Sequence, residues 1–319
     1  MFNFQLSSNK PQINYDELYD FIALGLGPAG LNAGLYAHRK GLKTLIVGHR
    51  VGGQLLNTAD IDNYLGFSNI PAQKLIDEFR NHIENSKVPM LTDVLVTNIE
   101  KSADIFIITL NNGKTLQSKT VLYALGGSPR KLKVPGEDRL AGKGVAYCAT
   151  CDGPFFQDKD VIIAGGGNSA IDATKDLARI AKSVTIVEKF TISADKTSVE
   201  QVAKLPNVTM FEETDVTEII GDKYIEGIRV FDRKANKERI INTEGLFVEI
   251  GSIPNTALLK DLVELNKWGE VIVNNKQETS LKGLYAAGDV TNNWIRQVIV
   301  AAADGAKAAL EANNYITKK

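Results

Sequence analysis

The stretch Phe21-Ile-Ala-Leu-Gly-Leu-Gly-Pro-Ala-Gly30 joins a short apolar run to a glycine-rich turn, and a helix-like segment continues from it through Lys40. The same pattern returns at Val161-Ile-Ile-Ala-Gly-Gly-Gly-Asn-Ser-Ala170, with a helix-like segment from Ile171 to Ile180. In both copies a second apolar run follows, Thr44 to Val47 and Val184 to Val187. Glycines in such a turn let the backbone approach a pyrophosphate, which the start of the helix then favours. Because the motif recurs in this strand-turn-helix context, the sequence predicts two dinucleotide sites.

Composition excludes several classes of function. The 319 residues are 44% hydrophobic and carry a net charge of -1, which leaves no basic face for nucleic acid and no polybasic membrane anchor. No apolar run reaches the roughly 18 residues that a membrane-spanning helix needs. Met1 to Asp20 lacks the layout of a signal peptide and is interpreted as a polar lead-in to the first strand. With only two cysteines in the chain, we expect a reducing compartment, the cytoplasm.

Shorter strands and turns fill the rest of the chain, without a flexible linker. Hairpin-like strands are expected at Ile105 to Leu110, Thr115 to Ser118, Val121 to Leu125, Ile225 to Asp232 and Arg239 to Thr243. Two domains must then be joined by short crossings, which we place near Ser128-Pro129 and near Ser252 to Pro254.

Both cysteines lie in the segment Cys148-Ala-Thr-Cys151, and Asp152 follows directly. The CxxC spacing can close a small disulfide ring and can lower the pKa of one thiol. A zinc site would need two further ligands, and the three histidines of the chain, His38, His49 and His82, lack the required spacing. The sequence therefore predicts a redox pair. Asp152 is placed for acid/base work, and its alternative role is to cap the next segment.

A second carboxylate stands at the end of a strand-like segment, in Gly283-Leu-Tyr-Ala-Ala-Gly288-Asp289. The segment precedes a helix-like run from Gln297 to Ala312. Asp289 can accept a hydrogen bond from a ribityl or ribose hydroxyl. The alternative is that it simply caps the helix.

These features together resemble the low-molecular-weight thioredoxin reductases, within the flavin-dependent disulfide reductases. The resemblance runs from about Tyr19 to near the end of the chain. It rests on Gly25-Leu-Gly-Pro-Ala-Gly30, Gly52-Gly-Gln54-Leu, Asn63-Tyr-Leu-Gly-Phe67, Ala124-Leu-Gly126, Pro129-Arg130, Cys148-Ala-Thr-Cys151-Asp-Gly, Gly165-Gly-Gly-Asn-Ser169, Gly251-Ser-Ile-Pro-Asn255, Ala287-Gly-Asp289 and Arg296-Gln297.

The resemblance implies an α/β fold with two Rossmann-like dinucleotide-binding domains of three-layer ββα character, the second inserted in the first. Residues 1–128 and 254–319 would form the FAD-binding domain, and 129–253 the nicotinamide-binding domain that carries the CxxC. It also implies a homodimer, a rotation of one domain against the other, and a thioredoxin or thioredoxin-like partner. Cys151 would face the flavin, Cys148 would attack the partner disulfide, and Asp152 would manage protons.

The predicted ligand residues fall into two sets. The FAD set is Gly25, Gly27, Pro28, Ala29, Gly30, Gly53, Gln54, Asn63, Gly126, Gly288, Asp289, Arg296, Gln297 and Val298. The nicotinamide set is Gly165, Gly167, Asn168, Ser169, Ala170 and Glu188. Whether His49 and Arg50 also hold the FAD adenosine ribose, or are exposed loop residues, stays open.

The second site departs from the family. NADPH-using members carry an arginine cluster after the second strand, whereas here Val187 to Ala194 contains none. Glu188 lies 23 residues after Gly165, where an acid would bind the ribose 2′-hydroxyl and repel the 2′-phosphate of NADPH. NADH is therefore favoured, although Lys189 could offset part of the repulsion. The alternative is that Glu188 is a solvated residue at the strand end.

Other functions remain open. Peroxiredoxin-reductase flavoproteins resemble this chain closely, but they carry an N-terminal thioredoxin-like module that we do not expect in the twenty residues before Phe21, so a separate thioredoxin-like partner would supply it. A ferredoxin-linked relative and a non-catalytic flavoprotein are further alternatives. The glycine turn at Gly165 argues against the first, and Cys148, Cys151 and Asp152 argue against the second.

Overall fold

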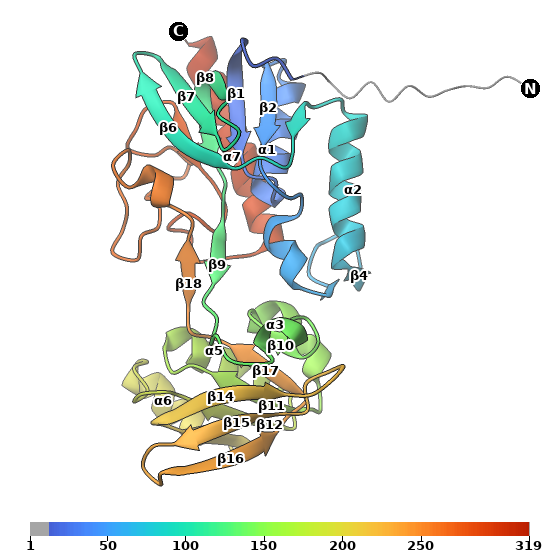
Figure 1. Ribbon diagram of the computed structural model, residues 1–319, viewed down its shortest axis with the longest axis vertical. Coiled ribbons are helices and arrows are strands. Elements are labelled where there is room, and N and C mark those ends of the chain that lie inside the picture. Colours follow the sequence, from blue (N-terminus) through green and yellow to red (C-terminus); the bar gives the residue numbers. More distant parts are fainter. Residues whose placement is uncertain (1–12, 319) are drawn as a thin grey trace, which may run out of the picture. The chain divides into compact units, whose positions relative to one another are not determined.

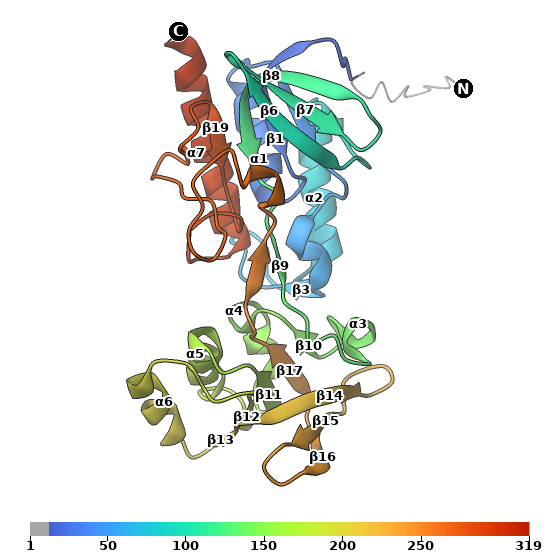
Figure 2. The same cartoon turned by 60° about the vertical axis from the view of Figure 1, so that its left-hand side comes forward.

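The computed structural model describes residues 13–318, which divide into two compact units (Figures 1 and 2). The first unit comprises residues 13–56, 73–128 and 254–318, and the second comprises residues 57–72 and 129–253. The polar lead-in predicted at the N-terminus falls partly outside the described residues, and the first strand already begins at Leu18. No helix within 13–318 has both the length and the apolar character needed to cross a membrane.

The first unit is built on a parallel sheet that an antiparallel hairpin extends. Its strands are β1 (Leu18–Leu24), β2 (Thr44–Val47), β5 (Met90–Leu91), β6 (Val96–Ser102), β7 (Ile105–Leu110), β8 (Thr115–Tyr123) and β19 (Leu284–Ala286). The strands β5, β2, β1, β8 and β19 are parallel neighbours in that order. The hairpin β6–β7 adds to β8 in antiparallel sense. The prediction of two separate strands between Thr115 and Leu125 is wrong, because β8 runs through both.

Three helices and two short 3-10 turns accompany this sheet. They are α1 (Pro28–Arg39), α2 (Ala72–Asn85), α7 (Val298–Thr317), η1 (Gly53–Asn57) and η3 (Ala257–Leu259). Proline at the first position of α1 suits a helix start, because the missing N–H is one that a helix leaves unpaired anyway. The predicted C-terminal helix is confirmed, but it continues five residues beyond Ala312.

The helices α1 and α7 pack backbone against backbone. A Cβ added at Gly305 would lie 2.0 Å from the carbonyl oxygen of Ala29. Beside it, the amide of Asn32 donates to the carbonyl of Ala302 over 2.7 Å. Glycine at 305 therefore lets α7 approach the first turn of α1, directly after the glycine-rich loop.

The second unit has three layers. A five-stranded parallel sheet in the order β10-β17-β11-β12-β13 lies between helices and the antiparallel meander β14-β15-β16. Its elements are β3 (Asp60–Ile61), β4 (Ile70–Pro71), α3 (Glu137–Leu140), β10 (Val145–Ala146), α4 (Ala149–Asp152), η2 (Gly153–Phe156), β11 (Asp160–Ala164), α5 (Asn168–Leu177), β12 (Ser183–Val187), α6 (Lys196–Ala203), β13 (Val208–Phe211), β14 (Thr214–Ile220), β15 (Gly227–Asp232), β16 (Lys237–Asn242) and β17 (Gly245–Val248).

Alternation along the central strand β11 explains the layers. Val161 and Ile163 join the cluster that contains the apolar face of α5, whereas Ile162 and Ala164 join the cluster that contains the meander. Successive strand residues point to opposite faces, so an all-apolar strand must be covered on both sides. The predicted α/β class with two Rossmann-type folds is confirmed. Two short strands that form a two-stranded sheet, β9 (Gly127–Pro129) and β18 (Ser252–Pro254), carry the chain from one unit to the other.

We predict that Gly305→Ala destabilises the first unit although alanine is the better helix former. The clash with Ala29 must push α1 and α7 apart, at a cost of about 1–3 kcal/mol, which lowers the unfolding temperature by about 2–12 °C. Circular dichroism on heating measures this change. The control is Ala303→Gly on the exposed face of α7, which carries only the propensity cost of about 1 kcal/mol. Unchanged or raised thermal stability of Gly305→Ala would contradict the packing argument.

Candidate active site

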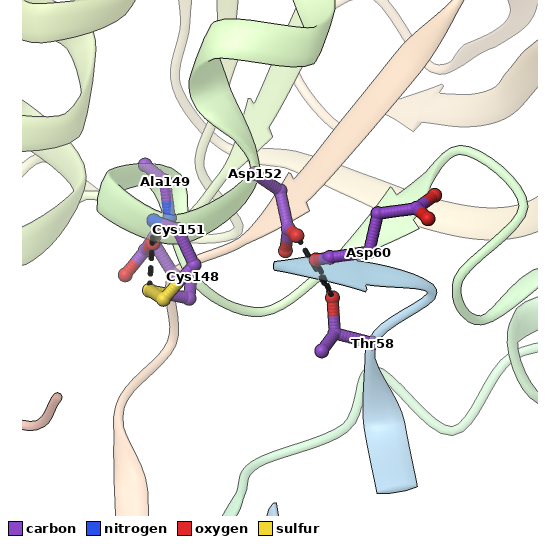
Figure 3. The surroundings of a disulfide bond; sticks show 7 residues. Thr58, Asp60, Cys148, Ala149, Cys151 and Asp152 are labelled. Carbon is purple, nitrogen blue, oxygen red and sulfur yellow. Dashed lines mark hydrogen bonds between the residues drawn. A yellow bond between two sulfur atoms is a disulfide. The ribbon is translucent and has the colours of Figure 1, made fainter. Parts of the chain in front are cut away.

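Cys148 and Cys151 are joined in a disulfide at the start of α4 (Figure 3). Cys148 is the residue that caps α4, with extended backbone, and its Sγ accepts a hydrogen bond from the N–H of Cys151 over 3.2 Å. The N–H of Asp152 donates to the carbonyl of Cys148 over 3.0 Å. The turn between the cysteines is therefore fixed by its own backbone, and both sulfur atoms are held in one short helical turn.

Asp152 points away from the disulfide toward the segment 57–72 (Figure 3). Its carboxylate accepts a hydrogen bond from the hydroxyl of Thr58 over 3.0 Å. Burial raises the pKa of Asp152 to about 6 and nearby Asp60 adds to the rise, whereas the Thr58 bond lowers it. Within the described residues the side chain makes no capping bond to η2, so the capping alternative is wrong. A carboxyl that titrates near neutral pH is suited to moving protons.

Glu249 is a second carboxyl beside the redox helix, and the sequence analysis missed it. It directly follows β17, and its Oε1 accepts a hydrogen bond from the N–H of Ala149, the first residue of α4, over 3.2 Å. Burial raises the pKa of Glu249 to about 7, and the Ala149 bond opposes the rise. An acid after a fully buried strand is a pattern that could have identified it, because ligands bind at the carboxyl ends of parallel strands.

The glycine turn of the second unit lines a pocket of about 630 Å³ at the ends of β11 and β12. Gly165 has a φ of 136°, and a Cβ there would lie 2.4 Å from the carbonyl oxygen of Glu249. A Cβ at Gly167 would meet no atom within 4 Å, so space stays open where α5 begins. This is the cradle that a pyrophosphate needs, and the residues fit a dinucleotide.

The other predicted nicotinamide ligands divide between the pocket and the core. Asn168, Ser169 and Glu188 line the pocket, whereas Ala170 is buried in the core beneath the turn. Glu188 lies against the glycine turn, because a Cβ at Gly166 would come within 2.8 Å of its Oε2. Its Oε1 accepts a hydrogen bond from the N–H of Phe190 over 2.8 Å.

Lys189 does not direct its charge at Glu188. Its ammonium lies 3.5 Å from Asp215, which also accepts two hydrogen bonds from Arg233, of 2.6 and 2.9 Å. Lys189 is therefore paired with Asp215, and no ion pair between Lys189 and Glu188 forms in the described chain, which leaves the carboxylate of Glu188 beside the turn.

The first glycine turn is built in the same way. Gly25 has a φ of 125°, and a Cβ there would lie 2.1 Å from the carbonyl oxygen of Ala124. A Cβ at Gly27 would meet only the Cα of Gly53, at 3.8 Å, and Gly288 packs against Ala29. The structure thus brings together the glycine turn, η1 and the end of β19 at the start of α1.

The remaining residues predicted for FAD are distributed as follows. The amide of Gln54 donates to the carbonyl of Gly127, Arg296 forms an ion pair with Glu270, and α7 starts at Val298 after Gln297. Asn63 lies in the segment 57–72, which groups with the second unit, so it is not gathered with the others in the first. Gly126 lies just after β8, with a φ of 64°. His49 and Arg50 are exposed.

Asp289 follows β19 at the carboxyl edge of the sheet. Burial raises its pKa and Arg296 lowers it. Among the described residues no hydrogen bond to its carboxylate is formed, and α7 begins after Gln297, so Asp289 does not cap that helix. A partly buried carboxylate without a protein donor fits a ligand hydroxyl.

Two nucleotide-binding folds and a redox disulfide define a flavoprotein disulfide oxidoreductase. Residues 19–305 match the model of the Pyridine nucleotide-disulphide oxidoreductase family, and the chain belongs to this family, whose members depend on FAD and a pyridine nucleotide.

Solved structures and curated relatives divide between two kinds of enzyme. Thioredoxin reductase from Streptococcus pyogenes MGAS5005 is similar over 95% of this chain and 99% of its own, with 32% identity and a TM-score of 0.90. Thioredoxin reductase from Giardia duodenalis is similar over 94% and 99%, with 30% identity and a TM-score of 0.89. The F subunit of alkyl hydroperoxide reductase from Staphylococcus epidermidis is 42% identical over 96% of this chain. The chain spans 61% of the length of that relative.

We predict that Asp152→Asn stabilises the second unit at neutral pH. The pKa of Asp152 is raised from 3.8 to about 6 in the folded chain. Asp152 therefore contributes fully to the stability of the folded chain below pH 4, where it is protonated, and this contribution is lost as the pH rises through 6. Asparagine removes that loss, so the free energy of unfolding of the variant should exceed that of the wild type by about 1–3 kcal/mol at pH 8 and by about half as much at pH 5.

Thermal unfolding at the two pH values measures this difference. The exposed residue Asp222 of the same unit provides the control, Asp222→Asn, which should show no such pH-dependent gain. Equal stability of Asp152→Asn and the wild type at pH 8 would mean that burial of the carboxylate costs little.

Proposed function

We propose that this chain reduces a thioredoxin-like protein disulfide with electrons from a reduced pyridine nucleotide, NADH in preference to NADPH. In the balanced reaction, NADH, a proton and a disulfide give NAD⁺ and two thiols. The proposal is supported above all by the disulfide at α4 in the same unit as the dinucleotide pocket. We further propose that the enzyme acts as a homodimer in the cytoplasm.

Each residue of the site has a distinct task in this proposal. Bound FAD supplies the chemistry that takes up a hydride and passes an electron pair to a disulfide. The electron pair would enter the Cys148–Cys151 disulfide at the sulfur of Cys151 and break the S–S bond, and Cys148 would then attack the partner disulfide as a thiolate. Asp152 holds or releases the proton that this exchange requires, since its pKa of about 6 lies near the working pH.

The preference for NADH is supported by the charges around the pocket. The carboxylate of Glu188 lies against Gly166, and the ion pair with Asp215 holds Lys189 away from it. A 2′-phosphate placed there would meet an acid with no arginine beside it in the segment from Val187 to Ala194. The open cradle at Gly167 favours a pyridine nucleotide over the ferredoxin alternative.

We predict that NADH bleaches the flavin faster than NADPH under anaerobic conditions. In Glu188→Gln, the ratio of the bleaching rate with NADH to that with NADPH should fall at least about tenfold, or 1.4 kcal/mol. The amide removes the repulsion of the 2′-phosphate and keeps an acceptor for the N–H of Phe190. Glu200→Gln, an exposed change on α6, is the control. If NADPH bleached the wild-type flavin faster than NADH, the role of Glu188 would be contradicted. If only reduced ferredoxin bleached it, ferredoxin would be the electron donor.

The second candidate is the reductase of a peroxiredoxin system. It is favoured by the identity of 42% to the alkyl hydroperoxide reductase component of Staphylococcus epidermidis, which exceeds the 32% to the thioredoxin reductase of Streptococcus pyogenes. Both candidates use the same chemistry at Cys148 and Cys151, and they differ only in the protein whose disulfide is reduced.

We predict that Cys148→Ser leaves reduction of the flavin by NADH intact and abolishes disulfide turnover, because the attacking thiolate is removed. Disulfide turnover that survives the change would refute the exchange mechanism. Supplying the wild type with thioredoxin, or with a thioredoxin-like module together with a peroxiredoxin and a peroxide, separates the two candidates. The protein disulfide that supports NADH oxidation with a kcat/KM at least about tenfold higher than the other is the substrate.

A further inference from the structure

Glu249 contacts two parts of the second unit that belong to different steps of the proposed reaction. Its N–H donates to the carbonyl of Ala164 over 2.8 Å, and its own carbonyl oxygen crowds Gly165 of the glycine turn. Its side chain instead reaches the N–H of Ala149 at the start of the redox helix. One residue therefore connects the nucleotide turn to the segment that carries the disulfide.

The charge of Glu249 has little compensation. Within residues 13–318 no lysine or arginine forms an ion pair with it, and the single Ala149 N–H is the group that favours its charged form. The charged groups lining the same pocket are Arg130, Lys131, Glu188, Lys189 and Asp215. On the redox helix the charged neighbour is Asp152. Such a carboxylate responds strongly to an anion that enters the pocket.

We propose that Glu249 is a positioning residue that couples occupancy of the nucleotide pocket to the redox helix, by taking up a proton when the nucleotide binds. The inference rests on the proposed function, because it requires a pyridine nucleotide in this pocket. The ligand brings two negative phosphates to a pocket that Glu249 lines, which disfavours its carboxylate and favours the protonated acid.

Protonation then changes the environment of the cysteines. A neutral carboxyl is a weaker acceptor for the Ala149 N–H, and it no longer opposes a negative thiolate nearby. Nucleotide binding should therefore lower the pKa of the Cys148 thiol in the reduced enzyme. By linkage, thiolate formation and nucleotide binding each favour the protonated Glu249.

The first experiment counts protons in the oxidised holoenzyme. ADP-ribose is the probe, since it carries both phosphates and cannot accept a hydride, and calorimetry in two buffers of different ionisation enthalpy measures the uptake. With a pKa that rises by about one unit from about 7, the wild type should take up at most about half a proton between pH 7 and 8, and almost none near pH 5 or pH 10. This wild-type profile needs no variant.

Two variants then test whether Glu249 is the group that takes up the proton. Glu249→Gln keeps the size and the acceptor of the side chain, so it should bind ADP-ribose without proton uptake. Glu244→Gln is the matched control: Glu244 accepts a backbone N–H from Asp160 at the opposite end of the same strand, outside the pocket. It should behave as the wild type.

The second experiment measures the thiol. After reduction by dithiothreitol and its removal, the rate of alkylation of Cys148 by iodoacetamide is followed against pH, with and without ADP-ribose. The ligand should shift the midpoint to lower pH in the wild type and in Glu244→Gln, and leave it in place in Glu249→Gln. A residue that only supports the helix would not make this shift depend on a titratable side chain.

The outcomes separate the two levels of the proposal. Binding of ADP-ribose without proton uptake in the wild type, or with undiminished uptake in Glu249→Gln, overturns the coupling and leaves the proposed function standing. A wild-type enzyme that neither binds ADP-ribose nor is bleached by NADH overturns both.

Discussion

Each unit depends on a contact between a glycine and the carbonyl oxygen at the end of the neighbouring strand. Gly25 meets the carbonyl of Ala124, and Gly165 meets that of Glu249, at distances that leave no room for a Cβ. Both glycines also have positive φ, which other residues rarely adopt. The contact lets the chain turn from strand to helix at the sheet edge, and it leaves the start of the helix open to an anion.

The two copies differ in the side chain of the residue whose carbonyl oxygen contacts the glycine. The residue that crowds the first glycine turn is Ala124, which adds only a methyl group, whereas in the second turn it is Glu249. The same backbone geometry therefore places no ionisable group at this position in the first unit. In the second unit it places a carboxyl between the turn and α4. The repeat explains the shared fold, and this difference places a carboxyl at the turn of the second unit that the first turn lacks.

The sequence predicted the elements whose causes are local. Glycine turns, apolar runs and the two-residue periodicity require only neighbouring residues, so α1, α5 and the strands around them were found close to their true ends. The contact of Thr58 with Asp152 joins residues 94 positions apart and depends on where the segment 57–72 packs, which no local pattern reveals. The sequence splits the long strand β8 because the polar residues Lys119 and Thr120 interrupt its pattern, whereas in the structure β1 pairs along it from Gln117 to Tyr123.

Two carboxyls with raised pKa values accompany the redox helix, Asp152 at about 6 and Glu249 at about 7. Each accepts one hydrogen bond from the described chain, from Thr58 or from Ala149, and neither forms an ion pair there. A lysine or arginine beside either would lower its pKa and fix its charge. Without one, burial destabilises both carboxylates, and in return both can gain or lose a proton near neutral pH. Disulfide exchange also consumes and releases protons near neutral pH. The burial that lowers the stability of the second unit therefore also keeps both carboxyls able to exchange protons in the pH range of the disulfide chemistry.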